Sequence, residues 1–196
     1  MKKNTLCLLI SISLFLTTCK KGEDDPLLSL RTRKARVEGD WMLESATVNL
    51  EFINFTQNTR LAENLYLQGP SLVGTEINGT VPYQVSYLFL LSVKFDKKGG
   101  FRLKETFSNN VIEASGIWDF DYGLGPDKRK EELTISLTDV SSGSTGSHIF
   151  NQFGTTFSYK IKELRNKKMV LKVSALTYSN KNGEEDTMSA EFTFTQ

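Results

Sequence analysis

The sequence predicts an all-β fold: an eight-stranded antiparallel up-and-down barrel, with a two-sheet β-sandwich as the alternative. Three observations lead to this prediction. Eight short segments have the composition of strands, several of them alternate apolar and polar residues, and short polar turns connect them. Short connections favour antiparallel neighbours, and closing such a sheet into a barrel removes its exposed edges.

The first four predicted strands are Met42–Phe52, Val85–Phe95, Phe101–Phe107 and Val111–Asp121. The polar turn Asp96–Gly100 ends in two glycines and joins the second strand to the third. In the third strand apolar residues alternate with polar ones, and this period of two predicts that one face of the strand is buried.

The last four predicted strands are Leu133–Thr138, Phe157–Leu164, Met169–Tyr178 and Thr187–Thr195. The first, second and fourth of these alternate apolar and polar residues, as expected of half-buried strands. The polar turn Arg165–Lys168 is short enough to predict a hairpin between the second and the third.

A long connection, Ile53–Gln84, separates the first two predicted strands. We expect it to be a loop, in which Arg60–Gln68 forms a short helix or an irregular turn. Loops of this length are uncommon unless they are functional or disordered. Apolar residues such as Leu65 and Leu72 indicate that this loop folds over the barrel mouth, a ligand or a partner.

The N-terminus has the pattern of a secretory signal. Lys2 and Lys3 precede an apolar run, Thr5–Leu16, that is shorter than the roughly 20 residues needed to span a bilayer. A basic head and a short apolar core predict a signal peptide over residues 1–18. Cys19 at the cut resembles the lipobox cysteine of bacterial lipoproteins, which is lipidated and becomes the new N-terminus. The resemblance implies that a lipid on Cys19 holds the protein in a membrane.

Residues 19–35 are predicted to be a flexible tether, because the stretch Lys20–Pro26 is charged and cannot bury a core. Acidic residues shortly after the lipidated cysteine resemble the signal that sends Bacteroidetes lipoproteins to the outer face of the outer membrane. We therefore expect the protein at the outer membrane, facing the cell exterior, with a periplasm-facing anchor as the alternative.

Two Gly-x-Trp triplets mark the remaining domain, Gly39-Asp40-Trp41 and Gly116-Ile117-Trp118. With the paired strands at 157–164 and 169–173, they resemble the lipocalin-like domains of Bacteroidetes lipoproteins. The resemblance covers residues 36–196. It implies a barrel of the calycin type, with the first tryptophan closing one end and the long loop lying over the open mouth.

The composition argues against several classes of function. A formal net charge of +1 provides no basic face for nucleic acid. Cys7 leaves with the signal peptide, so the domain has no disulfide and no cysteine-bound metal. The single histidine, His148, lies in a Ser/Gly-rich stretch that does not predict a pre-organised catalytic site. We therefore expect a non-enzymatic protein without a metal or cofactor.

The candidate ligand site is the barrel interior. Glu105 shares the parity of Phe101 and Leu103, so its carboxylate is predicted to face inward, where it could orient a ligand. Aromatic residues on other strands are candidates to line an apolar pocket, namely Trp118, Phe120, Phe157, Tyr159, Phe192 and Phe194. The alternative is that these side chains simply fill the core, since an eight-stranded barrel is just wide enough to be filled.

Two functions remain open at this point. The first is a lipid-anchored barrel that binds a small apolar or amphipathic molecule, or a glycan fragment, at its mouth. The second is a protein-interaction module with a filled barrel, acting as an accessory subunit of an envelope complex. In addition, Asp186-Thr187-Met188 resembles the O-glycosylation triplet of exported Bacteroidetes proteins, which makes Thr187 a candidate glycosylation site.

Overall fold

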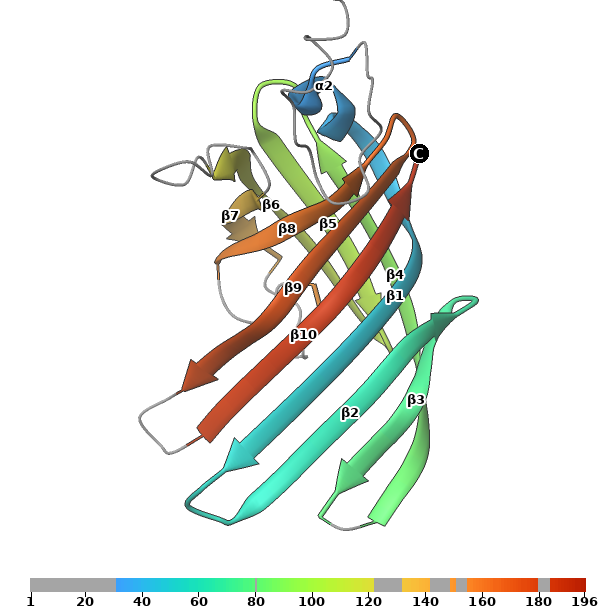
Figure 1. Ribbon diagram of the computed structural model, residues 1–196, viewed down its shortest axis with the longest axis vertical. Coiled ribbons are helices and arrows are strands. Elements are labelled where there is room, and N and C mark those ends of the chain that lie inside the picture. The colour runs from blue at the N-terminus through green and yellow to red at the C-terminus, as the bar shows by residue number, and fades with distance from the viewer. Residues whose placement is uncertain (1–30, 80, 122–131, 142–148, 151–154, 180–183) are drawn as a thin grey trace, which may run out of the picture.

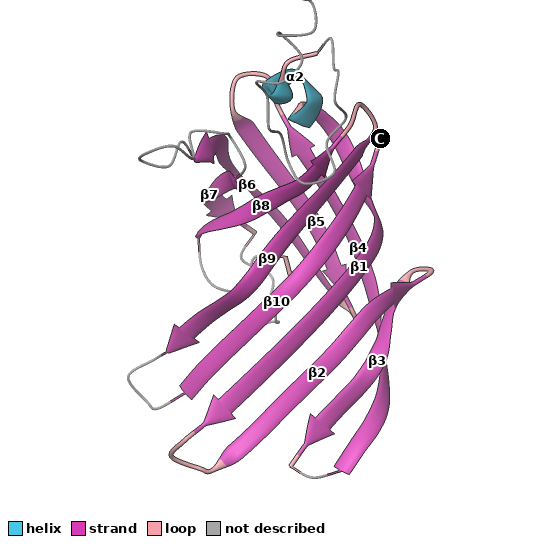
Figure 2. Cartoon of the chain, in the orientation of Figure 1, coloured by secondary structure: helices cyan, strands magenta, loops and turns pink. Residues whose placement is uncertain are grey.

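The computed structural model describes residues 31–79, 81–121, 132–141, 149–150, 155–179 and 184–196, with the backbone alone for residues 174–179. Strands dominate these residues, and a single short helix, α2 (Arg33–Val37), occurs among them (Figure 2). The predicted all-β class is therefore confirmed.

Within the described residues, ten antiparallel strands form one sheet that closes on itself in a ring (Figure 1). In chain order they are β1 (Gly39–Asn54), β2 (Thr59–Gln68), β3 (Ser71–Asn78), β4 (Val81–Phe95), β5 (Gly100–Phe107), β6 (Asn110–Asp121), β7 (Glu132–Val140), β8 (Thr156–Leu164), β9 (Lys168–Ser179) and β10 (Glu184–Thr195). Every strand pairs with its neighbours in sequence, and β10 pairs with β1. The closed sheet replaces the two-sheet sandwich that the sequence left open.

The prediction of eight strands is wrong in number, because the region 53–84 is not a loop. It contains the end of β1, all of β2 and β3, and the start of β4. Arg60–Gln68, expected as a helix or irregular turn, lies in β2. Tight turns at Gly69 (φ 58°) and Gly79 (φ 69°) allow the chain to reverse, since glycine adopts positive φ without steric cost.

The hairpin β2–β3 widens the sheet in one half only. At one end, Gly39–Met42 of β1 pair directly with Ser92–Phe95 of β4. Farther along β1, Thr47–Asn54 pair instead with Thr59–Tyr66 of β2. In Figure 1 the hairpin accordingly lies in the lower half of the molecule, together with the lower ends of β9, β10 and β1.

The helix α2 lies at the upper end of the sheet (Figure 1). The indole Nε1 of Trp41 donates to the Val37 carbonyl over 2.7 Å, and the Trp41 side chain is fully buried. The buried Arg36 guanidinium donates to the Leu164 carbonyl, which ties α2 to β8. Lys34 Nζ lies 5.5 Å from the centre of the Trp118 ring, a favourable cation–π position. The Trp41 indole thus joins this end of the sheet to α2.

Gly116, from the second triplet, is needed where β6 and β7 come close. A Cβ at this position would lie 2.1 Å from the Ser136 carbonyl oxygen, far inside van der Waals contact. The pairing of β6 with β7 shifts register between Ser115 and Gly116. A side chain here would push the two backbones apart at this β-bulge.

Candidate functional site

Glu105 on β5 faces the interior, as its parity predicts, and is fully buried. Its two carboxylate oxygens accept hydrogen bonds from the backbone N–H groups of Ile149 (2.8 Å) and Phe150 (3.0 Å). Burial raises the pKa of Glu105 to about 7, and the two N–H donors oppose that rise. The carboxylate therefore binds a segment of its own chain inside the closed sheet.

Phe150 fills the space beside this carboxylate. Its ring stacks on Tyr159, with ring centres 4.8 Å apart and planes 17° apart. Edge contacts follow with Phe157, Phe192 and Phe194 at 5.4 to 5.9 Å. The Tyr159 hydroxyl also donates to the Phe150 carbonyl, and burial raises the pKa of that phenol. Backbone and side chain of Phe150 are thus both held in the interior.

The six aromatic residues proposed to line a pocket are all buried, and Phe157 is the most exposed of them at 9%. All six belong to one continuous hydrophobic core. Trp118 and Phe120 pack edge to face with each other, and Trp118 packs on Phe95. The other four pack their rings around Phe150. This arrangement fits the core-filling alternative better than an open pocket.

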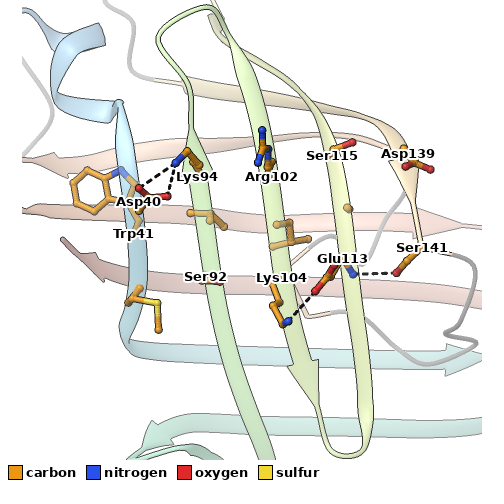
Figure 3. A pocket seen from close by; sticks show the side chains of 14 residues that line it. Asp40, Trp41, Ser92, Lys94, Arg102, Lys104, Glu113, Ser115, Asp139 and Ser141 are labelled. Carbon is orange, nitrogen blue, oxygen red and sulfur yellow. Dashed lines mark hydrogen bonds and ion pairs between the residues drawn. The ribbon is translucent and has the colours of Figure 1, made fainter.

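A groove of about 620 Å³ lies on the outside of the sheet, across β1, β4, β5, β6 and β7 (Figure 3). We call it the outer groove. One row of outward side chains crosses it in register, each opposite the next: Asp40, Lys94, Arg102, Ser115 and Asp139. The row places charged groups on four of these five strands, with Ser115 of β6 between Arg102 and Asp139.

A second row runs beside the first and contains Met42, Ser92, Lys104, Glu113 and Ser141. Lys104 Nζ lies 2.8 Å from Glu113, and this hydrogen bond and charge lower the pKa of Glu113. The Ser141 hydroxyl accepts from the Glu113 backbone N–H over 3.0 Å and joins β7 to β6. Among the described residues, no histidine or carboxylate is hydrogen-bonded to the serine hydroxyls of this row.

A carboxylate–tyrosine cluster occupies the inner face of the β2–β3 hairpin. It was not predicted from the sequence. Glu63 and Glu76 are directly opposite each other in the register of β2 and β3. Glu76 is buried and accepts hydrogen bonds from the hydroxyls of Tyr83 and Tyr87, the latter over 3.0 Å. Burial and the neighbouring Glu76 raise the pKa of Glu63 to about 7. Glu63 occupies every second position together with Leu61 and Leu65, and this shared parity is the sequence signal that could have placed its side chain on the inner face.

A second hollow, of about 490 Å³, lies at the lower end of the same hairpin. Phe52 and Leu61 supply apolar surface, and Asn78, Glu184 and Asp186 supply polar groups. Burial raises the pKa of Asp186, and the nearby Glu184 adds to that rise. Two carboxylates and the Arg60 guanidinium thus line this hollow.

The remaining predicted residues fall outside any described site. Thr187 lies within β10, partly buried, opposite Glu51 of β1 and Thr177 of β9. Cys19 and His148 lie outside the described residues. Within the described ranges, no group of three or more histidines, cysteines and acids is placed to hold a metal ion. Of the helical segments that the structure describes, none has the length and hydropathy to cross a bilayer.

Comparison with known proteins gives no relative: no family model, no curated protein and no solved structure matches this chain.

Proposed function

We propose that this chain is a lipid-anchored, non-catalytic module of the bacterial outer membrane that recognises a protein partner on its outer surface. In this proposal the closed sheet is a lipocalin-like up-and-down barrel whose interior serves as core. Cys19 carries the lipid, residues 1–18 are removed, and the domain is held at the cell exterior by the tether.

The observation that carries the proposal is the occupied interior. The place where a lipocalin-like barrel would hold a small molecule contains Phe150, which four aromatic rings surround. Glu105, the buried carboxylate that faces this space, already accepts hydrogen bonds from two backbone N–H groups. A ligand would have to replace both the ring packing and these hydrogen bonds, whereas the outer groove is open to solvent.

Native mass spectrometry of the full chain, purified gently from a related host, tests this function. We expect the protein to appear without a bound small molecule, because the interior is already filled. A mass increment that disappears on denaturation would instead identify an interior ligand and overturn the proposal. Labelling with palmitate, compared between the wild type and Cys19→Ser, tests the anchor separately.

One specific observation supports a second function, which is the binding of a small apolar ligand inside the sheet. Main-chain N–H groups, and no cation, satisfy the Glu105 carboxylate among the described residues. A ligand that carries two N–H donors on an apolar body would satisfy the carboxylate equally well. The same mass spectrum separates the two functions.

A further inference from the structure

Some charged side chains of the outer groove form ion pairs within the protein, and others do not. Lys94 lies 3.0 Å from Asp40, and Lys104 lies 2.8 Å from Glu113. These two ion pairs stand on either side of Arg102, one in each row (Figure 3). The two lysines are therefore committed to carboxylates within the protein.

Arg102 and Asp139 are the uncommitted charges of the groove. Neither side chain makes a hydrogen bond or an ion pair with another residue in the part of the chain that the structure describes. Both are exposed, and Ser115 stands between them in the register of β5, β6 and β7. Two strand spacings separate them, which is about 10 Å. The groove thus offers one cation and one anion at a fixed separation.

We propose that the outer groove is the docking site for an extended polypeptide segment of the partner, which carries an acidic and a basic side chain on the same face. This inference rests on the proposed function, because it names the partner chemistry for the outer surface. The acid pairs with the Arg102 fork, which suits a carboxylate, and the base pairs with Asp139. In an extended segment, residues i and i+2 share a face and lie about 7 Å apart, so a long basic side chain covers the remaining distance.

The sign pattern of the groove favours a polypeptide over an anionic polysaccharide. Three carboxylates, Asp40, Glu113 and Asp139, balance the three cations of the groove, Lys94, Arg102 and Lys104, so the groove carries no net positive charge. A polymer with negative charge on every unit would meet these carboxylates as well as the guanidinium. A segment that carries both signs pairs with Arg102 and Asp139 together and avoids that repulsion.

An apolar margin next to the charged rows supports the same choice. Leu90 lies two residues from Ser92 on β4, and Val111 lies two residues from Glu113 on β6. Both are about half exposed, at 48% each, and Met42 in the second row is exposed at 60%. Protein interfaces combine such apolar surface with polar groups. Without these apolar side chains the groove would offer a partner only ionic contacts.

The test is a titration of the full chain in detergent micelles with a defined peptide, followed by ¹⁵N–¹H NMR. The probe is acetyl-Ser-Glu-Ser-Lys-Ser-amide, which places its two charges on one face of an extended chain. A peptide of the same composition with adjacent Glu and Lys places them on opposite faces and is the ligand control. Lys160→Glu, on the exposed part of β8, is the matched charge-reversal control in the protein.

We expect the probe to shift the backbone resonances of residues 102, 115 and 139, and to bind at least tenfold more weakly to Arg102→Asp and to Asp139→Arg. The double variant Arg102→Asp/Asp139→Arg should recover binding, because the peptide satisfies the reversed pair by lying in the opposite direction. A variant that merely damaged the fold would not be rescued in this way, and Lys160→Glu should bind as the wild type does.

Three results would overturn the inference: no shift at these residues, equal binding of the two peptides, or binding that neither charge reversal weakens. Polygalacturonate is included as a polyanion, and a stronger effect of this polymer on the same resonances would assign the groove to an anionic polysaccharide instead. Failure of the proposed function would be visible elsewhere, as a small molecule in the native mass spectrum, so the two failures are distinguishable.

Discussion

Replacement of Phe150 by alanine is the most direct test of the filled interior. The Phe150 side chain is 1% exposed and contacts four aromatic rings at 4.8 to 5.9 Å. Truncation of a buried phenylalanine to alanine costs roughly 3–5 kcal/mol. We expect a loss in the middle of that range, about 4 kcal/mol, because the stacked contact with Tyr159 is lost with the ring.

Urea unfolding followed by circular dichroism measures this loss. With a dependence of about 2 kcal/mol per molar urea, the midpoint of Phe150→Ala should fall by about 2 M. The matched control is Phe55→Ala, in the turn after β1, where the phenylalanine is 63% exposed. Surface substitutions of this kind change the free energy of unfolding by less than about 0.5 kcal/mol. If the two variants unfold at the same urea concentration, Phe150 is not part of the core.

Three further predictions concern the sheet itself. The pKa of Glu63 is raised from 4.5 to about 7 in the folded protein, so the contribution of Glu63 to stability is fully present below about pH 4.5 and is lost as the pH rises through 7. The melting temperature of the protein should therefore fall over this pH interval. The fall should be smaller in the variant Glu63→Gln. Gly116→Ala should lower the free energy of unfolding by about 2 kcal/mol or more, because the new Cβ would lie 2.1 Å from the Ser136 carbonyl oxygen. Gly79→Ala should lower it by only about 1 kcal/mol, because the new Cβ would meet no atom within 4 Å and only the positive φ is unfavourable. Parallel urea titrations compare the two variants. Glu105→Gln should destabilise by about 1–3 kcal/mol, because one of the two buried N–H groups loses its acceptor, and an unchanged urea midpoint would contradict the hydrogen bonds described.

Alternation of apolar and polar residues was sufficient to find most of the sheet. Each of the eight predicted strands overlaps an observed strand, and the ends differ by a few residues. The inward direction of Glu105 followed from the same period of two, because its neighbours Phe101 and Leu103 are on the buried face. Local pattern is a strong predictor where one face of a strand packs against a core.

The hairpin β2–β3 was missed because its buried face is not uniformly apolar. Glu63 and Glu76 occupy positions on the inner face, where the pattern requires apolar residues. Gly74 interrupts β3 for a different reason, since a Cβ there would lie 1.9 Å from the Asn64 carbonyl oxygen. Two carboxylates and a glycine on the inner face break the alternation of apolar residues, so the two strands were predicted as a long loop.

The partner of Glu105 could not be predicted from local pattern at all. Its hydrogen-bond donors, Ile149 and Phe150, lie 44 and 45 residues away in the sequence. Nothing in the alternation of β5 indicates which distant segment enters the interior. The sequence therefore predicts a buried carboxylate that needs a partner, and only the fold supplies the pair of N–H groups.

Asp139 shows why the outer groove was also missed. Leu133, Ile135 and Leu137 are buried, so strict alternation would direct Asp139 inward as well. The register shifts between β6 and β7, and Thr138 is the extra residue: Gly116 is opposite Leu137, while Ser115 is opposite Asp139. The bulge turns Asp139 to the outer face, in line with Arg102. The second uncommitted charge of the outer groove is thus a product of strand pairing. Without the extra residue, Asp139 would lie opposite Ala114 and face inward. Among the described groove residues Arg102 would then be the only uncommitted charge, and the proposed preference for a segment of mixed charge would give way to one for a simple anion.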